Sequence, residues 1–144
     1  MITAAGLEDL DRLLELALLL WPDNPPVVLR EEIAQTLEGG DAAYFLWLED
    51  GNALGFAQVR IRREYVEGTS TSPVGCLERI SVRNTHRGRG IASELLTKCE
   101  SWARERGLRE FASDCALNNT DSLRFHLKNG FLEAGRLICF RKPL

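Results

Sequence analysis

The chain has 144 residues, of which 44% are hydrophobic and 27% are charged, a composition typical of a globular protein. Its formal net charge of −3 disfavours nucleic acid as the main partner, because phosphate backbones bind to basic faces. No apolar run is long enough to span a membrane, and no basic segment followed by an apolar one marks the N-terminus. We therefore expect one cytoplasmic domain, residues 1–144, with no membrane as partner.

The hydrophobic pattern predicts helices and strands in mixed order along the chain. Asn24 and Pro25 favour the start of the second helix, and Asn119 or Thr120 favours the start of the last one. The expected helices are residues 7–20, 25–38, 91–106 and 120–128. The expected strands are residues 43–48, 53–63, 74–82, 110–115 and, near the C-terminus, part of 131–141. This pattern predicts an α/β fold with a central mixed (α+β) sheet flanked by helices.

The four cysteines are Cys76, Cys99, Cys115 and Cys139, and each lies within an apolar pattern. None of them forms a C-x-x-C pair, the spacing that many zinc sites use. We therefore expect no metal site and interpret the thiols as reduced and at least half-buried.

The segment 87–92, Arg-Gly-Arg-Gly-Ile-Ala, joins an apolar strand to an amphipathic helix. Glycines let backbone N–H groups approach an anion, and the helix adds free N–H groups and the positive end of its dipole. This arrangement indicates a pyrophosphate site. No Lys-Ser or Lys-Thr follows, as a P-loop requires, and Ser93 stands at the third glycine of a dinucleotide fingerprint. A solvated helix start is the alternative interpretation.

Two motifs resemble those of the GNAT superfamily of N-acetyltransferases. The turn matches R-x-x-G-x-A, and the segment 119–131 is similar to N-x-x-A-x-x-L-Y-x-x-x-G-F, with His126 in the place of the tyrosine. The resemblance covers the whole chain and implies the GNAT acyl-CoA N-acyltransferase fold, with acetyl-CoA as cosubstrate. It also implies that a backbone N–H, that of Val82, binds the acetyl carbonyl. The implied coenzyme residues are Ile80, Val82, Arg87, Gly88, Arg89, Gly90, Ile91, Ala92, Asn119 and Ser122.

Acetyl transfer to an amine needs a base for the amine and an acid for the leaving thiolate. Period-two alternation puts Glu78 on the face of Val82 unless a bulge intervenes, which makes Glu78 the candidate base. Asp114 ends the neighbouring strand and is the candidate that orients the amine or relays its proton. His126 is the candidate acid, since histidine commonly changes charge near neutral pH. The alternatives are an arginine-paired surface carboxylate for Glu78, a turn residue for Asp114 and a structural side chain for His126.

A narrower resemblance concerns the amine acceptor. Trp21-Pro22 and the segments 64–74, 77–82, 112–114 and 140–142 look like motifs of the aminoglycoside 6′-N-acetyltransferases. The resemblance implies direct attack on the thioester by the 6′-amine of an aminoglycoside, as in antibiotic resistance. Such an acceptor is a polycation, which suits carboxylates around a cleft. The expected acceptor residues are Trp21, Asp23, Tyr65, Glu67, Glu78 and Asp114.

Three positions depart from the motifs of this family. Arg79 stands where glycine is common, Phe140 where tyrosine is frequent, and Gly135 where some relatives have a carboxylate. The rival functions are acetyl transfer to another amine, such as a polyamine or a peptide amine, and a non-catalytic acyl-CoA-binding module. Retention of Glu78 and Asp114 disfavours the module.

The segment 136–140 is expected to be a terminal strand rich in apolar residues. An exposed apolar edge favours association, and the resemblance implies dimers, because aminoglycoside acetyltransferases are commonly dimeric. We therefore expect a homodimer formed through the C-terminal strands.

Overall fold

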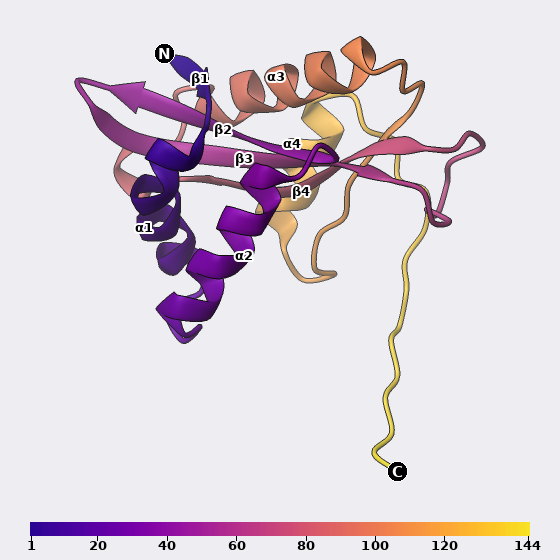
Figure 1. Cartoon of the computed structure of the whole chain (residues 1–144). Coiled ribbons are helices and arrows are strands. Elements are labelled where there is room, and N and C mark those ends of the chain that lie inside the picture. The colour runs from indigo at the N-terminus through magenta and orange to yellow at the C-terminus, as the bar shows by residue number, and fades with distance from the viewer.

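Five strands form one mixed sheet in a computed structural model that describes residues 1–144 (Figure 1). The strands lie in chain order; the first four pair antiparallel, and the last pairs parallel with its neighbour. This confirms the mixed sheet that the sequence predicts. The strands are β1 (Ile2–Ala4), β2 (Ala42–Glu49), β3 (Asn52–Arg62), β4 (Val74–Val82) and β5 (Phe111–Ala112).

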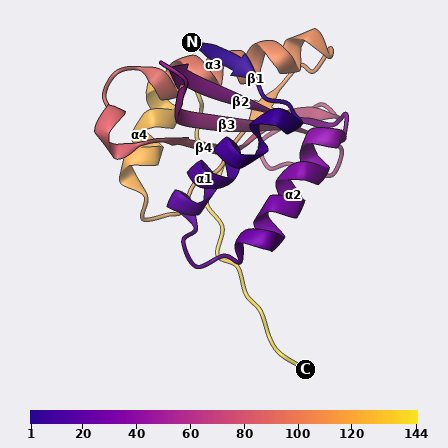
Figure 2. The ribbon, with the colours of Figure 1, turned by 60° about the vertical axis from the view of Figure 1, so that its left-hand side comes forward.

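Helices cover both faces of this sheet. In Figures 1 and 2, α1 and α2 lie against one face and α3 lies against the other. The last helix, α4, contributes Phe125 to the apolar cluster under α3. The helices are α1 (Leu10–Leu20), α2 (Pro26–Glu38), α3 (Ile91–Glu105) and α4 (Thr120–Lys128), with 3-10 turns at Leu7–Asp9 and Asn84–His86.

Each face of the sheet has its own hydrophobic core. Under α1 and α2, the side chains of Leu13, Ile33 and Phe56 pack together and are buried. Under α3, Leu95 packs with Val59, and both are fully buried. Burial of an apolar side chain of this size contributes about 1.5–3 kcal/mol. The two cores therefore hold β3 and β4 firmly at the centre of the molecule.

The pairing between β4 and β5 is short and leaves most of β4 open along one edge. Gly75 and Cys76 pair with the two residues of β5, whereas β4 continues to Val82. Beyond this pairing, the chain segment that follows β5 separates from β4. We call the opening the fork; its sides are residues 77–82 of β4 and the chain that follows Ala112.

Three predicted elements differ from the structure. The sequence pattern misses β1, because three residues are too few to show a period, although β1 pairs with β2. The predicted strand 110–115 is reduced to two residues, because the chain leaves β4 at the fork. The predicted terminal strand within 131–141 is wrong: Phe131 packs against the cluster under α3, and the segment then extends away and pairs with no strand (Figure 1).

The cysteine prediction is right for two residues and wrong for two. Cys76 and Cys99 are buried, whereas Cys115 and Cys139 are exposed because they lie in the irregular C-terminal segments. None of the helices combines the length and the hydropathy that crossing a membrane requires.

Candidate active site

The turn before α3 presents unpaired backbone N–H groups. Gly88 and Gly90 both have φ of 79°, a left-handed conformation that suits glycine, and a Cβ at either position would meet no atom within 4 Å. The N–H groups of residues 87–90 donate to no other group of the protein. The first N–H groups of α3, which starts at Ile91, lack intrahelical partners. Free donors and open space therefore fit this turn to a pyrophosphate.

The arginine side chains of the turn bind to the protein itself. The Nε of Arg87 donates to the carbonyl oxygen of Val82 over 3.3 Å, and Arg89 pairs with Glu49 of β2 over 2.6 Å. The hydrogen bond from Arg89 lowers the pKa of Glu49. These bonds fasten the turn to β4 and β2, so its backbone, rather than its guanidinium groups, is the exposed donor.

Val82 points its backbone N–H into the fork. Antiparallel strands alternate hydrogen-bonded and non-hydrogen-bonded pairs. The N–H of Arg83 donates to the oxygen of Leu54 over 2.8 Å, so the preceding pair, Val82 with Gly55, is a non-hydrogen-bonded one. The N–H of Val82 therefore points away from β3, toward the open edge. Ile80, two residues earlier, has the same orientation.

A β-bulge places Glu78 on the opposite face from Val82. Leu77 and Arg79 pair with consecutive residues of β3, which leaves Glu78 as the extra residue. Val82 packs in the core under α3, whereas Glu78 contacts Arg62 on the face of α1 and α2. The prediction that Glu78 and Val82 share a face is wrong, because the bulge shifts the alternation by one residue.

A bidentate ion pair with Arg62 of β3 holds Glu78. The Nε and Nη2 of Arg62 donate to the two carboxylate oxygens over 2.8 and 2.9 Å. This bond raises the pKa of Arg62 above its usual value. The pairing is the alternative that the sequence left open for Glu78. It fixes the orientation of the carboxylate and leaves each oxygen a lone pair for a further donor.

Cys76 and Asp114 lie beside this ion pair. Burial, with a smaller contribution from the charge of Glu78, raises the pKa of the Cys76 thiol to about 11, so the thiol is neutral at physiological pH. The charges of Glu78, Arg62 and Asp114 all act on the Cys76 thiol, so the three side chains lie within electrostatic range of it. Asp114 is exposed and follows β5 by two residues. The structure thus gathers both candidate carboxylates at the fork.

His126 is fixed by hydrogen bonds on both of its ring nitrogens. The Nδ1 lies 2.6 Å from the carbonyl oxygen of Ser122, and the Nε2 lies 2.7 Å from the Oγ of Ser113. The ring is half-buried between the aromatic rings of Phe125 and Phe131, with centroids 5.6 and 5.0 Å away. His126 therefore connects α4 to the residue next to β5.

The start of α4 also contains the two remaining candidate coenzyme residues. The Oδ1 of Asn119 accepts the N–H of Ser122 over 3.1 Å. This confirms Asn119 as the helix cap, one of the two caps that the sequence offers. The bond rigidifies the first turn of α4.

The loop between β3 and β4 carries Tyr65 and Glu67, and both are exposed. The hydroxyl of Tyr65 donates to Glu67 over 3.0 Å, which raises the pKa of Tyr65. Glu110 anchors the loop: its Oε1 accepts both backbone N–H groups and both hydroxyls of Ser70 and Thr71, over 2.6–3.5 Å. The bond from the Thr71 hydroxyl is the first cause that lowers the pKa of Glu110. The loop is thus fastened to the residue that precedes β5.

Trp21 and Asp23 follow α1, and the two side chains differ in their contacts. The guanidinium of Arg79 lies over the ring of Trp21, 4.7 Å from its centroid, a cation–π contact. Asp23 is exposed and makes no side-chain contact to the other candidates. Arg79 therefore occupies one face of the ring of Trp21, which is an expected acceptor residue.

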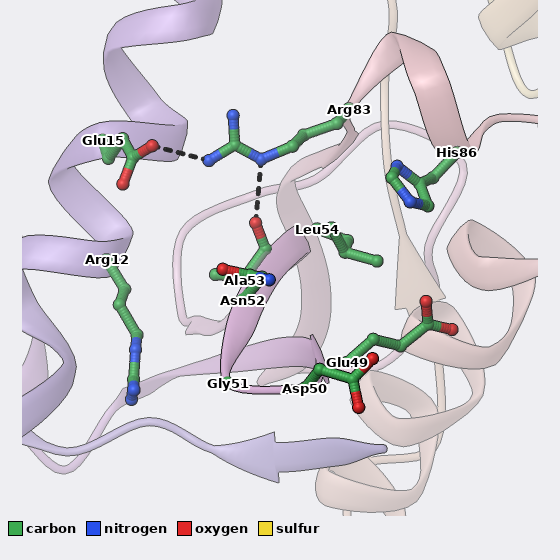
Figure 3. A pocket seen from close by; sticks show the side chains of 10 residues that line it. All are labelled: Arg12, Glu15, Glu49, Asp50, Gly51, Asn52, Ala53, Leu54, Arg83 and His86. Atoms are coloured by element: carbon green, nitrogen blue, oxygen red, sulfur yellow. Dashed lines mark hydrogen bonds and ion pairs between the residues drawn. The ribbon is translucent and has the colours of Figure 1, made fainter.

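A cavity of about 550 Å³ lies elsewhere, between α1, the β2–β3 hairpin and the turn at residues 84–86 (Figure 3). In Figure 3 the side chain of Arg83 reaches Glu15 and the backbone oxygen of Ala53, at 2.8 and 2.9 Å. None of the candidate catalytic residues lines this cavity. Of its charged groups, only Arg83 and Glu15 pair with each other, whereas Arg12 pairs with Asp9 and Glu49 with Arg89. We place the site at the fork, because the candidate catalytic residues lie there and not in this cavity.

Four residues that shape the candidate site are not among those expected from the sequence: Arg62, Arg79, Ser113 and Glu110. Arg79 is noted there only as a departure from the family motif. Ser113 lies within the segment 112–114 whose resemblance draws attention to Asp114, which is a signal for it. Arg62 and Glu110 act through partners 16 and 40 residues away, and no local pattern reveals such contacts.

The fold and the fork define an acetyltransferase, and the chain belongs to the acetyltransferase (GNAT) family, which residues 10–131 match. The particular relatives are aminoglycoside acetyltransferases. The chain is 40% identical over 131 residues to the aminoglycoside N(6′)-acetyltransferase type 1 of Stenotrophomonas maltophilia, covering 90% of this chain and 84% of that one. The family resemblance and the fold predicted from the sequence are confirmed.

Two solved structures extend this likeness. The aminoglycoside N-acetyltransferase AAC(6′)-Iy in complex with CoA is 35% identical, with a TM-score of 0.96 over 100% of this chain and 95% of that one. AAC(6′)-Iy in complex with the bisubstrate analogue CoA-S-monomethyl-acetylneamine is 37% identical, with a TM-score of 0.91 over 100% and 98%.

Proposed function

We propose that the protein transfers acetyl from acetyl-CoA to the 6′-amine of aminoglycosides. The observation that carries the proposal is the fork, which has free backbone donors on one side and two carboxylates, Glu78 and Asp114, on the other. The names of the relatives support an aminoglycoside acceptor, and the CoA complexes of the solved neighbours support the donor.

In the proposed reaction, the N–H groups of residues 87–92 bind the pyrophosphate of acetyl-CoA, and Asn119 and Ser122 line the coenzyme at the start of α4. The N–H of Val82 stabilises the negative charge on the thioester oxygen as the amine attacks directly. Glu78, oriented by Arg62, receives the proton that the amine loses. Two kinds of side chain bind the positively charged acceptor. The carboxylates are those of Asp23, Glu67, Glu78 and Asp114, and the aromatic faces are those of Trp21 and Tyr65.

Steady-state release of coenzyme A thiol, measured with a panel of amines, tests this proposal. Kanamycin-type substrates with a 6′-amine should be acetylated, whereas analogues with a 6′-hydroxyl should not react at that carbon. Mass spectrometry locates the acetyl group. If polyamines or peptide amines have higher kcat/KM than every aminoglycoside, the acceptor assignment is wrong. If no amine releases thiol while acetyl-CoA binds, the protein is an acyl-CoA-binding module.

Antibiotic resistance is the biological form of this proposal. Expression of the gene in the cytoplasm of a susceptible bacterium, where acetyl-CoA is available, should raise the inhibitory concentration of kanamycin. Expression of a Glu78→Gln variant should not. Equal inhibitory concentrations with and without the wild-type protein would contradict a resistance function.

We also propose that the protein is a homodimer that pairs through its C-terminal segment. Leu132, Leu137, Ile138 and Phe140 are 73–91% exposed in the single chain. The outer edge of β5 pairs with no strand. An extended apolar segment and an open sheet edge are complementary, and a twofold arrangement covers both.

Sedimentation equilibrium tests the dimer. The wild type should sediment at twice the chain mass of 16.2 kDa, and Ile138→Asp should sediment at the chain mass. Val27→Asp is the matched control, since Val27 is similarly exposed but lies on α2. A wild type at the mass of one chain would rule out the dimer.

A further inference from the structure

We infer that the hydroxyl of Ser113 delivers the proton to the leaving thiolate and that His126 resupplies this proton. The inference rests on the proposed acetyl transfer and assigns Ser113 a catalytic role. His126, in this scheme, acts through Ser113 and is a positioning and proton-supplying residue rather than the group that touches the sulfur.

The hydrogen bonds of His126 determine the role of each nitrogen. A carbonyl oxygen only accepts, so Nδ1 donates its proton to the oxygen of Ser122, 2.6 Å away. In the neutral ring Nε2 then accepts the Ser113 hydroxyl, 2.7 Å away. In the protonated ring Nε2 donates to the Ser113 oxygen, and the hydroxyl hydrogen is free to point elsewhere. Protonation of His126 therefore converts Ser113 into an available donor.

Ser113 lies at the vertex of the fork. The last pair between β4 and β5 is Cys76 with Ala112, so Ser113 is the first residue after the strands separate. Phe111, two residues earlier, packs against the cluster under α3, and alternation puts Ser113 on that same face. Asp114 then lies on the other face, with Glu78. The proton-accepting groups and the proton-donating group thus flank the fork from opposite faces.

The side-chain lengths agree with this arrangement. An imidazole is shorter than a phenol, so the ring of His126 extends less far from α4 than a tyrosine at this position of the motif would. The Ser113 hydroxyl, hydrogen-bonded to Nε2, extends the reach of the ring. One hydroxyl is therefore available in either case, on tyrosine or on serine.

The proton step balances as follows. When the carbon–sulfur bond breaks, its electron pair stays on sulfur, and the sulfur takes the proton of the Ser113 hydroxyl. The Ser113 oxygen takes the Nε2 proton of the imidazolium. The ring becomes neutral and keeps its proton on Nδ1, which still donates a hydrogen bond to the Ser122 oxygen. Solvent returns one proton to His126, and the amine loses one proton on the Glu78 side.

Ser113→Ala should lower kcat by about 10²-fold, with little change in the KM of acetyl-CoA or of the acceptor. His126→Gln, which retains a hydrogen-bonding group but cannot become cationic, should lower kcat by a similar factor. The double variant should lose no more than either single variant, because both residues serve one proton transfer. Ser101→Ala on α3 is the matched control for loss of a serine hydroxyl.

Rescue separates a proton path from a structural bond. Ser113→Ala combined with His126→Tyr should recover most of the lost kcat, since the tyrosine hydroxyl reaches the fork directly. If the Ser113–His126 bond only anchors α4, this double variant stays as slow as Ser113→Ala. A Ser113→Ala variant with kcat near the wild-type value would also overturn the inference. Thermal unfolding and acetyl-CoA binding show whether each variant is folded. If Ser113→Ala is not folded, the kcat of His126→Gln decides the outcome.

Failure of the inference is distinct from failure of the proposed function. If the wild type acetylates no aminoglycoside, the acceptor assignment fails, and the same variants are compared with whichever amine releases thiol. If the wild type acetylates aminoglycosides and Ser113→Ala is equally fast, only the role of Ser113 fails.

Discussion

The two faces of the sheet present different kinds of chemical groups to the fork. On the side of α3 and α4 the groups are backbone N–H donors and the neutral hydroxyl of Ser113. On the side of α1 and α2 they are charges: Glu78 paired with Arg62, and Arg79 over Trp21. Main-chain donors change little with substitution, whereas charged side chains change with every one. The comparison teaches that the proposed donor site rests on backbone geometry and the proposed acceptor site on side-chain identity.

Glu78→Gln should have the largest effect on catalysis, because it removes a charge on the side of α1 and α2. Loss of the carboxylate should lower kcat by roughly 10²–10⁴-fold, because the amide cannot accept the amine proton. Asp41→Asn is the control, since it weakens another arginine–carboxylate pair, with Arg63, that is fully at the surface. Stopped assays of coenzyme A release check both variants. Near-normal turnover of Glu78→Gln at every pH would demote Glu78 to a structural role.

Gly90→Val should weaken acetyl-CoA binding by the backbone N–H groups on the other side of the fork. A side chain at this left-handed position would fill the open space above the turn and lower acetyl-CoA affinity by at least about tenfold, or 1.4 kcal/mol. Gly107→Val is the matched control: Gly107 has φ of 75°, open surroundings and a place after the other end of α3. Both variants lose about 1–2 kcal/mol to backbone strain, so only coenzyme binding differs. Unchanged calorimetric affinity in Gly90→Val would remove the coenzyme from this turn.

Asp114→Asn should sharpen the comparison, because its effect is confined to the acceptor. The acceptor KM should rise by up to about fivefold, as expected for an exposed ion pair worth no more than 1 kcal/mol. The KM of acetyl-CoA should not change. Asp11→Asn, an exposed aspartate on α1, is the control. Equal changes in both KM values would show that Asp114 does not separate donor from acceptor.

Glu110→Gln tests how the loop between β3 and β4 is held in place. Hydrogen bonds from the loop lower the pKa of Glu110 in the folded state. A lowered folded pKa adds stability above the unfolded value, about 4.3 for glutamate, and this stability is lost as pH falls through the folded pKa. The difference in thermal midpoint between wild type and variant should therefore be largest at neutral pH and shrink in acid. A difference that is constant with pH would contradict the role of the charge.

The sequence predicts the local structural features of the proposed donor side. The glycine turn and the Asn119 cap are local features, and a short stretch of residues contains all that they need. The periodicity of α3 likewise predicts its buried positions, Leu95 and Cys99 among them. Local sequence therefore predicts the structure of those parts of the site that depend on backbone conformation.

The acceptor side is less predictable for a physical reason. The bulge at Glu78 is visible only in the register between β3 and β4, and the partner of Glu78 is chosen by tertiary contact. The C-terminal segment has the composition of a strand, but composition does not select a partner, and the segment pairs with no strand although the outer edge of β5 is open. Contacts between distant residues, rather than local preference, decide these positions.

The anchor at Glu110 has an evolutionary consequence. One carboxylate oxygen holds residues 70–71 of the loop mainly through their backbone N–H groups and small hydroxyls, while residues 65–67 stay at the surface. Mutations at the tip can accumulate without disturbing the fastening or either core. If residues 65–67 contact the acceptor as proposed, substitutions there can change which amine is bound without altering the anchor at Glu110 or either core.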